Sequence, residues 1–153
     1  MRKLLIVSHA PSTNSLAMAA AVARGAAHVD ISDVEVRSLP ALDAGPADVL
    51  WADGILLGST ENFGYMSGGM KDFFDRIYYP CLDQTQALPY ALFIRAGNDG
   101  HGARTSMERI ITGLRWKQVQ PPLICAGAFR EDFLGDCEEL GMTMAAGLEA
   151  GIY

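Results

Sequence analysis

The sequence predicts a single α/β domain of three layers, a five-stranded parallel sheet in the order 2-1-3-4-5 with helices on both faces. Short apolar runs alternate with helical segments through all 153 residues, which is typical of strands joined by crossover helices. Most of the runs are continuously apolar, as expected for parallel strands covered on both sides. The length suits one domain with a substantial core, and the domain is predicted to span residues 1–153.

Each strand is predicted from its apolar pattern. The second differs from the others because Val34 and Val36 alternate with Glu35 and Arg37, which indicates a strand near the sheet edge with one wet face. The fifth is interrupted by two prolines. The predicted strands are Lys3–Val7, Val34–Leu39, Gly54–Gly58, Tyr90–Arg95 and Val119–Cys125.

The helices are predicted from alanine content and from apolar residues at helical spacing. The last helix is expected to begin at Asp136, because Asp136 and Glu139 have the spacing of a capping box. A short helix is expected near Ala47–Trp51, beyond a stretch broken by proline and glycine. The longer predicted helices are Asn14–Ala27, Ser67–Ile77, Ala103–Leu114 and Asp136–Ala150.

Composition excludes several classes of protein. The net charge of −6 argues against a nucleic-acid partner or an anionic membrane surface, each of which needs a basic face. No apolar stretch approaches the ~20 residues of a membrane span. The apolar run after Met1 is too short for a signal peptide, so we expect a cytoplasmic protein. Cys81, Cys125 and Cys137 form no metal-binding pattern and are expected to be free thiols, with Cys125 in the core.

The segment after the first predicted strand has the composition of an anion site. Hydroxyl and amide side chains fill Ser8–Ser15, and an alanine-rich helix follows. Helix N-termini carry unpaired N–H groups and a partial positive charge, so they bind phosphate readily. No Lys or Arg lies between Lys3 and Arg24, so backbone and hydroxyl groups would hold the anion. The segment lacks the glycines of a Walker A or Rossmann loop, and an ordinary capped helix start also fits it.

Two further loops are expected at the same edge, because the carboxyl ends of parallel strands meet near the switch point of the sheet. Gly58–Lys71 mixes aromatic and amide residues with glycine, and Ala96–Gly102 has three glycines among seven residues. Glycine lets the backbone approach a flat ligand closely. Each loop alone could be a simple turn, but together they favour a ligand site.

The second loop and the helix after it resemble the flavodoxin-like FMN proteins, above all the NAD(P)H-dependent FMN reductases and the quinone reductases of the tryptophan-repressor-binding-protein type. The similarity covers nearly the whole chain and includes the first loop and the last helix. One departure is Thr60, where the family usually has proline. The resemblance rests on the spacing of Phe63-Gly64, Met66, Lys71 and Phe73-Phe74-Asp75.

The resemblance assigns roles to residues by position. Lys71 and Asp75 are expected to be structural. The FMN phosphate would be held by Ser8, Ser12, Thr13, Asn14 and Ser15. The isoalloxazine ring would be bordered by Ser59, Thr60, Glu61, Asn62, Phe63 and Gly64, and its pyrimidine side or the ribityl chain by Gly97, Asn98, Asp99 and Gly100.

The function that the resemblance implies is NAD(P)H-dependent reduction of a quinone, free flavin or similar small acceptor through bound FMN. The flavin carries the chemistry, so no catalytic side chain and no metal are expected. His9 and His101 lie in the loops but are not required as acids or bases. The resemblance also implies a homodimer. We expect Tyr65, Tyr78, Tyr79 and Trp116 to be exposed, as a dimer face or a flavin lid.

Two other functions stay open at this stage. A flavodoxin-type electron carrier between proteins would suit the short chain. Such carriers are usually more acidic, however, and often have an aromatic residue in the third loop, which this chain lacks. A cofactor-free binding module is the other alternative, and Thr60 is the one feature that hints at it.

Overall fold

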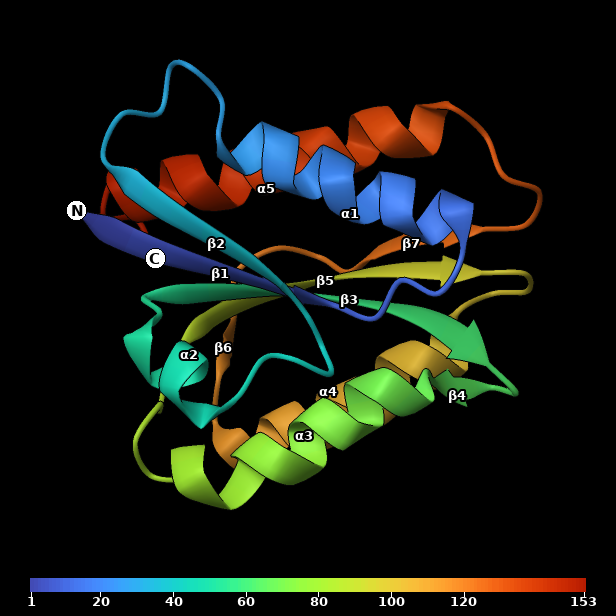
Figure 1. Ribbon diagram of the computed structural model, residues 1–153, viewed down its shortest axis with the longest axis horizontal. Coiled ribbons are helices and arrows are strands. Elements are labelled where there is room, and N and C mark those ends of the chain that lie inside the picture. Colours follow the sequence, from blue (N-terminus) through green and yellow to red (C-terminus); the bar gives the residue numbers. More distant parts are fainter.

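The computed structural model describes residues 1–153 as three layers, with a twisted sheet between two sets of helices (Figure 1). Helices α1 and α5 cover one face, and α3 and α4 cover the other together with the short α2. The strands are β1 (Arg2–Ser8), β2 (Val34–Pro40), β3 (Gly54–Asn62), β4 (Tyr65–Met66), β5 (Pro89–Ala96), β6 (Lys117–Gln118) and β7 (Leu123–Ala126). The helices are α1 (Thr13–Ala26), α2 (Pro46–Trp51), α3 (Gly68–Cys81), α4 (His101–Leu114) and α5 (Asp132–Glu149).

The sheet has the order β2-β1-β3-β5, with β6 and β7 both beside β5, and these strands are all parallel. The predicted fold class and the order 2-1-3-4-5 are therefore confirmed. Strand β2 lies at the edge, with Val34 and Val36 half-buried and Glu35 exposed as predicted, but Arg37 is half-buried as well. The central residues of β1 and most of β3 are buried. The order of strands places the end of β1 between those of β2 and β3.

The fifth strand differs from the prediction. Instead of one strand over Val119–Cys125, the chain forms β6 and β7, which pair with opposite ends of β5. Pro121 and Pro122 lie between them. Proline has no N–H to donate to a ladder, so the two prolines divide the strand.

The third strand is longer than predicted. It continues past Gly58 to Asn62 and then turns back through Phe63 and Gly64 into β4, which pairs with it antiparallel. Residues expected in an open loop therefore form a hairpin. Proline is poorly tolerated inside a sheet ladder, so Thr60 is compatible with a strand that continues through this position.

The last helix begins earlier than predicted. Helix α5 starts at Asp132, so Asp136 lies inside it and the predicted capping box is wrong. Phe133 is buried and packs edge-on against Phe129, with ring centroids 5.8 Å apart. Burial of Phe133 against the half-buried Phe129 favours a helix that includes the preceding turn, and this outweighs the local cap signal.

Trp116 is also a correction, because it is buried rather than exposed. Its indole N–H donates to the hydroxyl of Thr85 at 2.8 Å, which satisfies the polar end of the side chain. Tyr65 and Tyr79 are exposed as predicted, whereas Tyr78 is partly buried. All three cysteines are free and buried, including Cys125.

Helices α1 and α5 approach each other at the level of their backbones. A Cβ on Gly25 would lie 1.8 Å from the carbonyl oxygen of Glu138, and one on Gly141 would lie 2.0 Å from that of Val22. Only glycine fits at these two positions. None of the helices has both the length and the apolar character that a bilayer span requires.

We predict that Gly141→Ala lowers the free energy of unfolding by about 1–3 kcal/mol, because the new methyl group must push the two backbones apart. Urea denaturation measures the change. Gly135→Ala, in the same helix but with no atom within 4 Å of the added Cβ, is the matched control. It should leave stability unchanged or raise it by up to about 1 kcal/mol. Equal losses in the two variants would contradict the close helix contact.

Candidate functional site

The three predicted loops meet at the carboxyl edge of the sheet. Ser8 at the end of β1 is level with Gly58 in β3, and Gly58 is level with Phe93 in β5. The chain continues from these strands into the starts of α1, α3 and α4. The sheet thus brings together segments that are far apart in the sequence.

The start of α1 has both used and unused hydrogen-bonding groups. Ser12 and Ser15 form a capping box, in which each side chain accepts from the other residue's backbone N–H. Their hydroxyls also lie 2.8 Å apart. By contrast, the backbone N–H groups and the side chains of Thr13 and Asn14 have no hydrogen-bond partner in the protein and are exposed. The free donors at this helix start therefore belong to Thr13 and Asn14.

His9 is held between the β1–α1 loop and the start of α3. A Cβ on Gly69 would lie 2.4 Å from the imidazole ring, so the ring packs directly on the helix backbone. The buried Nδ1 atom of His9 has no hydrogen-bond partner. Buried nitrogen atoms are normally paired, so this atom is a polar group available to a ligand or a water molecule.

The tip of the β3–β4 hairpin presents an aromatic side chain to solvent. Phe63 has φ of 55° and Gly64 has φ of 71°, as in the two-residue turns that join antiparallel strands. The side chain of Phe63 is fully exposed. No other large apolar side chain is as exposed as that of Phe63.

The β5–α4 loop supplies the third side of the site. Gly97, Asn98 and Asp99 are exposed, and the side-chain amide of Asn98 has no partner. Asp99 accepts from the backbone N–H of His101 at 3.0 Å, so its carboxylate is bound to the start of α4. Space for a flat ligand is available beside Gly97, because a Cβ there would have no atom within 4 Å.

Two of the predicted ring-site residues turn their side chains inward. Ser59 is buried, and its hydroxyl accepts from the backbone N–H of Ser67 at 3.0 Å. Glu61 accepts from the backbone N–H of Ala103 at 3.2 Å. Thr60 donates to Asn62 at 3.1 Å. Ser59 and Glu61 can therefore shape the site through the backbone, whereas their side chains bond elsewhere in the protein.

The guanidinium of Arg95 is held by hydrogen bonds within the protein. Arg95, near the end of β5, donates to the carbonyl oxygens of Ala96, Cys125 and Gly127. No Lys or Arg occurs within residues 8–15, 59–64 or 97–100. An anion at the start of α1 would therefore bind neutral donors and the helix dipole.

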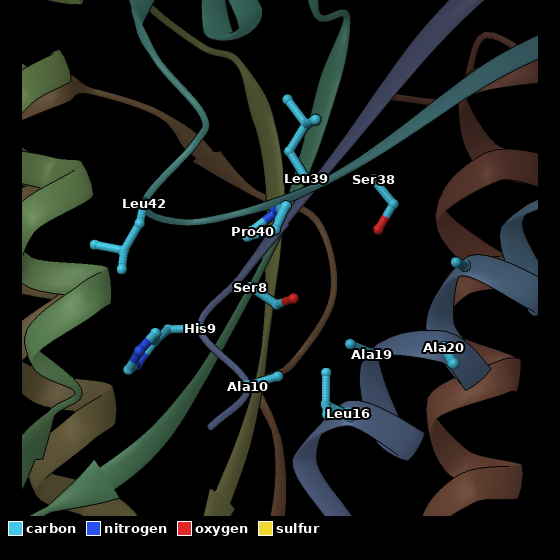
Figure 2. Close-up of a pocket in the computed structure, with 11 residues that line it drawn as sticks. Ser8, His9, Ala10, Leu16, Ala19, Ala20, Ser38, Leu39, Pro40 and Leu42 are labelled. Carbon is cyan, nitrogen blue, oxygen red and sulfur yellow. The ribbon is translucent and has the colours of Figure 1, made fainter. Parts of the chain in front are cut away.

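A cavity of about 370 Å³ lies on the other side of the β1–α1 loop, between α1 and the end of β2. Figure 2 shows the hydroxyls of Ser8 and Ser38 directed into this space. Ser8 is on the same sheet face as Ile6, which explains why its hydroxyl faces α1 rather than the hairpin. The remaining wall is mostly apolar and comes from Leu16, the alanines of α1 and Leu42.

Lys71 and Asp75 form an ion pair of 2.7 Å on the surface of α3. This bond raises the pKa of Lys71. Two residues not predicted for the site also shape it, namely Ser67, which caps α3, and Ser106, which accepts a hydrogen bond from the hairpin. Ser67 directly precedes a glycine pair and a helical pattern, so a cap was predictable there. Ser106 has no local signal, because its partner is 40 residues away.

Comparison with known proteins agrees with this architecture. The model of the family described as NADPH-dependent FMN reductase matches residues 1–126. The chain belongs to this family. A curated relative named flavodoxin, from Aquifex aeolicus (strain VF5), is 32% identical over 114 residues, which are 74% of this chain. The chain spans 60% of the length of that relative.

Solved structures show the same fold. An archaeal flavodoxin superposes with a TM-score of 0.81 and 22% identity, covering 96% of this chain and 99% of the other. A WrbA-like flavodoxin from Agrobacterium tumefaciens has a TM-score of 0.76 and 17% identity, covering 99% of each chain. The flavodiiron protein from Giardia intestinalis has a TM-score of 0.81 and 14% identity, covering 98% of this chain and 37% of that one. The flavodoxin-like fold is thereby established for the family member described here.

Proposed function

We propose that this protein binds FMN at the carboxyl edge of the sheet and uses NAD(P)H to reduce a small acceptor such as a quinone or a free flavin. The observation that carries the proposal is the pair of unpartnered N–H groups at Thr13 and Asn14. They lie where strand ends converge, in a chain that belongs to the FMN reductase family.

The donors at the start of α1 fit a phosphate monoester. Phosphate oxygens accept hydrogen bonds from backbone N–H groups, hydroxyls and amides, and these are the free groups of Thr13 and Asn14. The capping box fixes the first turn, so the donors are already oriented before a ligand arrives. The phosphate of FMN would bind here, held by Thr13 and Asn14 with Ser12 and Ser15 supporting the turn.

The ring would lie between the hairpin tip and the β5–α4 loop. Phe63 offers an apolar surface, and the open space beside Gly97 lets the backbone approach a ring edge. Asn98 has a free amide for polar atoms of the ring or the ribityl chain. Bound FMN supplies hydride acceptance and electron transfer, and the protein's part is to bind, orient and limit access to it.

A reductase is favoured over a carrier because one face of the ring would stay open. Residues 96–102 contain no Phe, Tyr or Trp to cover that face. His101 is exposed and lies 3.7 Å from Asp99, away from the core. A nicotinamide ring needs direct access to one flavin face, and this arrangement allows it.

The second candidate function is electron transfer between protein partners. It is favoured by the 32% identity to a relative named flavodoxin. The two functions differ in whether a nicotinamide nucleotide reduces the bound flavin.

We predict that the FMN-loaded protein loses its visible flavin absorption within seconds when NADPH or NADH is added without oxygen. Stopped-flow absorbance measures this, and dithionite defines full reduction. Flavin that stays oxidised with both nucleotides but is reduced by dithionite would reject the reductase and favour the carrier.

We predict that replacing Thr13 and Asn14 with alanine weakens FMN binding by about 10–100-fold, because charge-assisted hydrogen bonds to phosphate are lost. Riboflavin, which lacks the phosphate, should bind with little change. Quenching of flavin fluorescence measures both affinities. Ser38→Ala removes an unbonded hydroxyl from the neighbouring cavity and is the control. An equal loss for FMN and riboflavin would contradict the phosphate assignment.

A further inference from the structure

The β3–β4 hairpin needs support from outside the sheet. Strand β4 has only two residues and pairs with β3 alone. A hairpin this short is not stable by itself. Its turn carries Phe63 and Gly64, the residues expected beside the flavin ring, so whatever holds the hairpin also places the ring site.

Glu61 joins the hairpin to the start of α4. The N-cap residue of α4, Gly100, has φ of 75° and offers no side chain for capping. Glu61 in β3 caps the helix instead, because its Oε2 accepts a hydrogen bond from the backbone N–H of Ala103 at 3.2 Å. A negative group is favourable at this end of a helix. Glu61 thereby closes a contact between segments 42 residues apart.

Two further contacts hold the same two segments together. The hydroxyl of Ser106 accepts from the N–H of Met66 at 3.1 Å and donates to the carbonyl of Ala103 at 2.9 Å. A Cβ on Gly102 would lie 1.9 Å from the carbonyl oxygen of Gly64, so the turn rests on the helix backbone. The hairpin and the first turn of α4 thus form one unit.

We propose that Glu61 is a positioning residue for the flavin ring, acting through its bond to α4 and not through contact with the ring. This inference rests on the proposed FMN function. The bond fixes the separation between Phe63 on the hairpin and Gly97 to Asp99 before the ligand binds. Binding then orders fewer groups, which increases affinity for any ligand that contains the ring.

Two substitutions of Glu61 distinguish a positioning role from a direct effect of the negative charge on the ring. Gln in place of Glu keeps an oxygen that accepts from Ala103, whereas Ala removes the acceptor. A positioning role therefore predicts that Glu61→Gln behaves like the unmodified protein. A direct effect of the negative charge on the ring predicts that Gln and Ala behave alike.

Affinities for FMN and riboflavin, measured by fluorescence quenching, test the proposal. We expect Glu61→Ala to weaken both ligands equally, by about tenfold, since both contain the ring. Glu61→Gln should stay within about threefold of the unmodified protein. The matched control is Glu149→Ala. Glu149 accepts from the backbone N–H groups of Asp33 and Ser32 at 2.9 Å, at the opposite edge of the sheet. Those bonds lower the pKa of Glu149, and its loss should leave both affinities unchanged.

Hydrogen exchange of the ligand-free protein supplies a readout that does not depend on flavin. The amide of Ala103 should exchange faster in Glu61→Ala and at the normal rate in Glu61→Gln. Ser106→Ala, which breaks the second contact, should weaken both ligands in the same direction, so the test survives if Glu61→Ala fails to fold. Unchanged affinities in Glu61→Ala, or equal losses in the Ala and Gln variants, would overturn the positioning role. Failure of the unmodified protein to bind either ligand would instead overturn the proposed function.

Discussion

Backbone contact between α1 and α5 determines where the candidate site can form. Gly25 and Gly141 let the two helices touch, and together the helices cover one face of the sheet. This close contact fixes how α1 lies against α5, and the short segment between Ser8 and Thr13 keeps its first turn near the end of β1. The position of the free N–H groups of Thr13 and Asn14 therefore depends in part on Gly25 and Gly141, which lie on other turns of α1 and α5. Binding chemistry at this edge depends on packing that contains no functional side chain.

The opposite face holds the rest of the site by a different kind of interaction. There, hydrogen bonds of Glu61 and Ser106 between the hairpin and α4 add to a close backbone contact between Gly64 and Gly102. His9 lies in the β1–α1 loop, and its ring packs on the start of α3. One support of the site is therefore helix packing, and in the other a few hydrogen bonds add to a single backbone contact. These hydrogen bonds lie near solvent, so single substitutions can loosen the second support more easily than the first.

The sequence was sufficient for the sheet order, most helices and the edge at which the loops meet, because hydrophobic periodicity and strand–helix alternation are local signals. It failed where distant contacts decide the structure. Burial of Phe133 extends α5 past the apparent cap at Asp136, and Trp116 is buried through its bond to Thr85. The inward bonds of Ser59 and Glu61 were equally hidden, because their partners come from other loops. For the site, the sequence identified the segments but could not say which side chains remain free.

The most direct test of the account is the location of bound FMN, and amide chemical shifts of ¹⁵N-labelled protein during an FMN titration would show it. The account predicts the largest changes at Thr13 and Asn14, around the hairpin turn, and over residues 97–100. The cavity between α1 and β2, where Ser38 and Leu42 lie, should change little. Large changes confined to that cavity, with the start of α1 unaffected, would contradict the central claim.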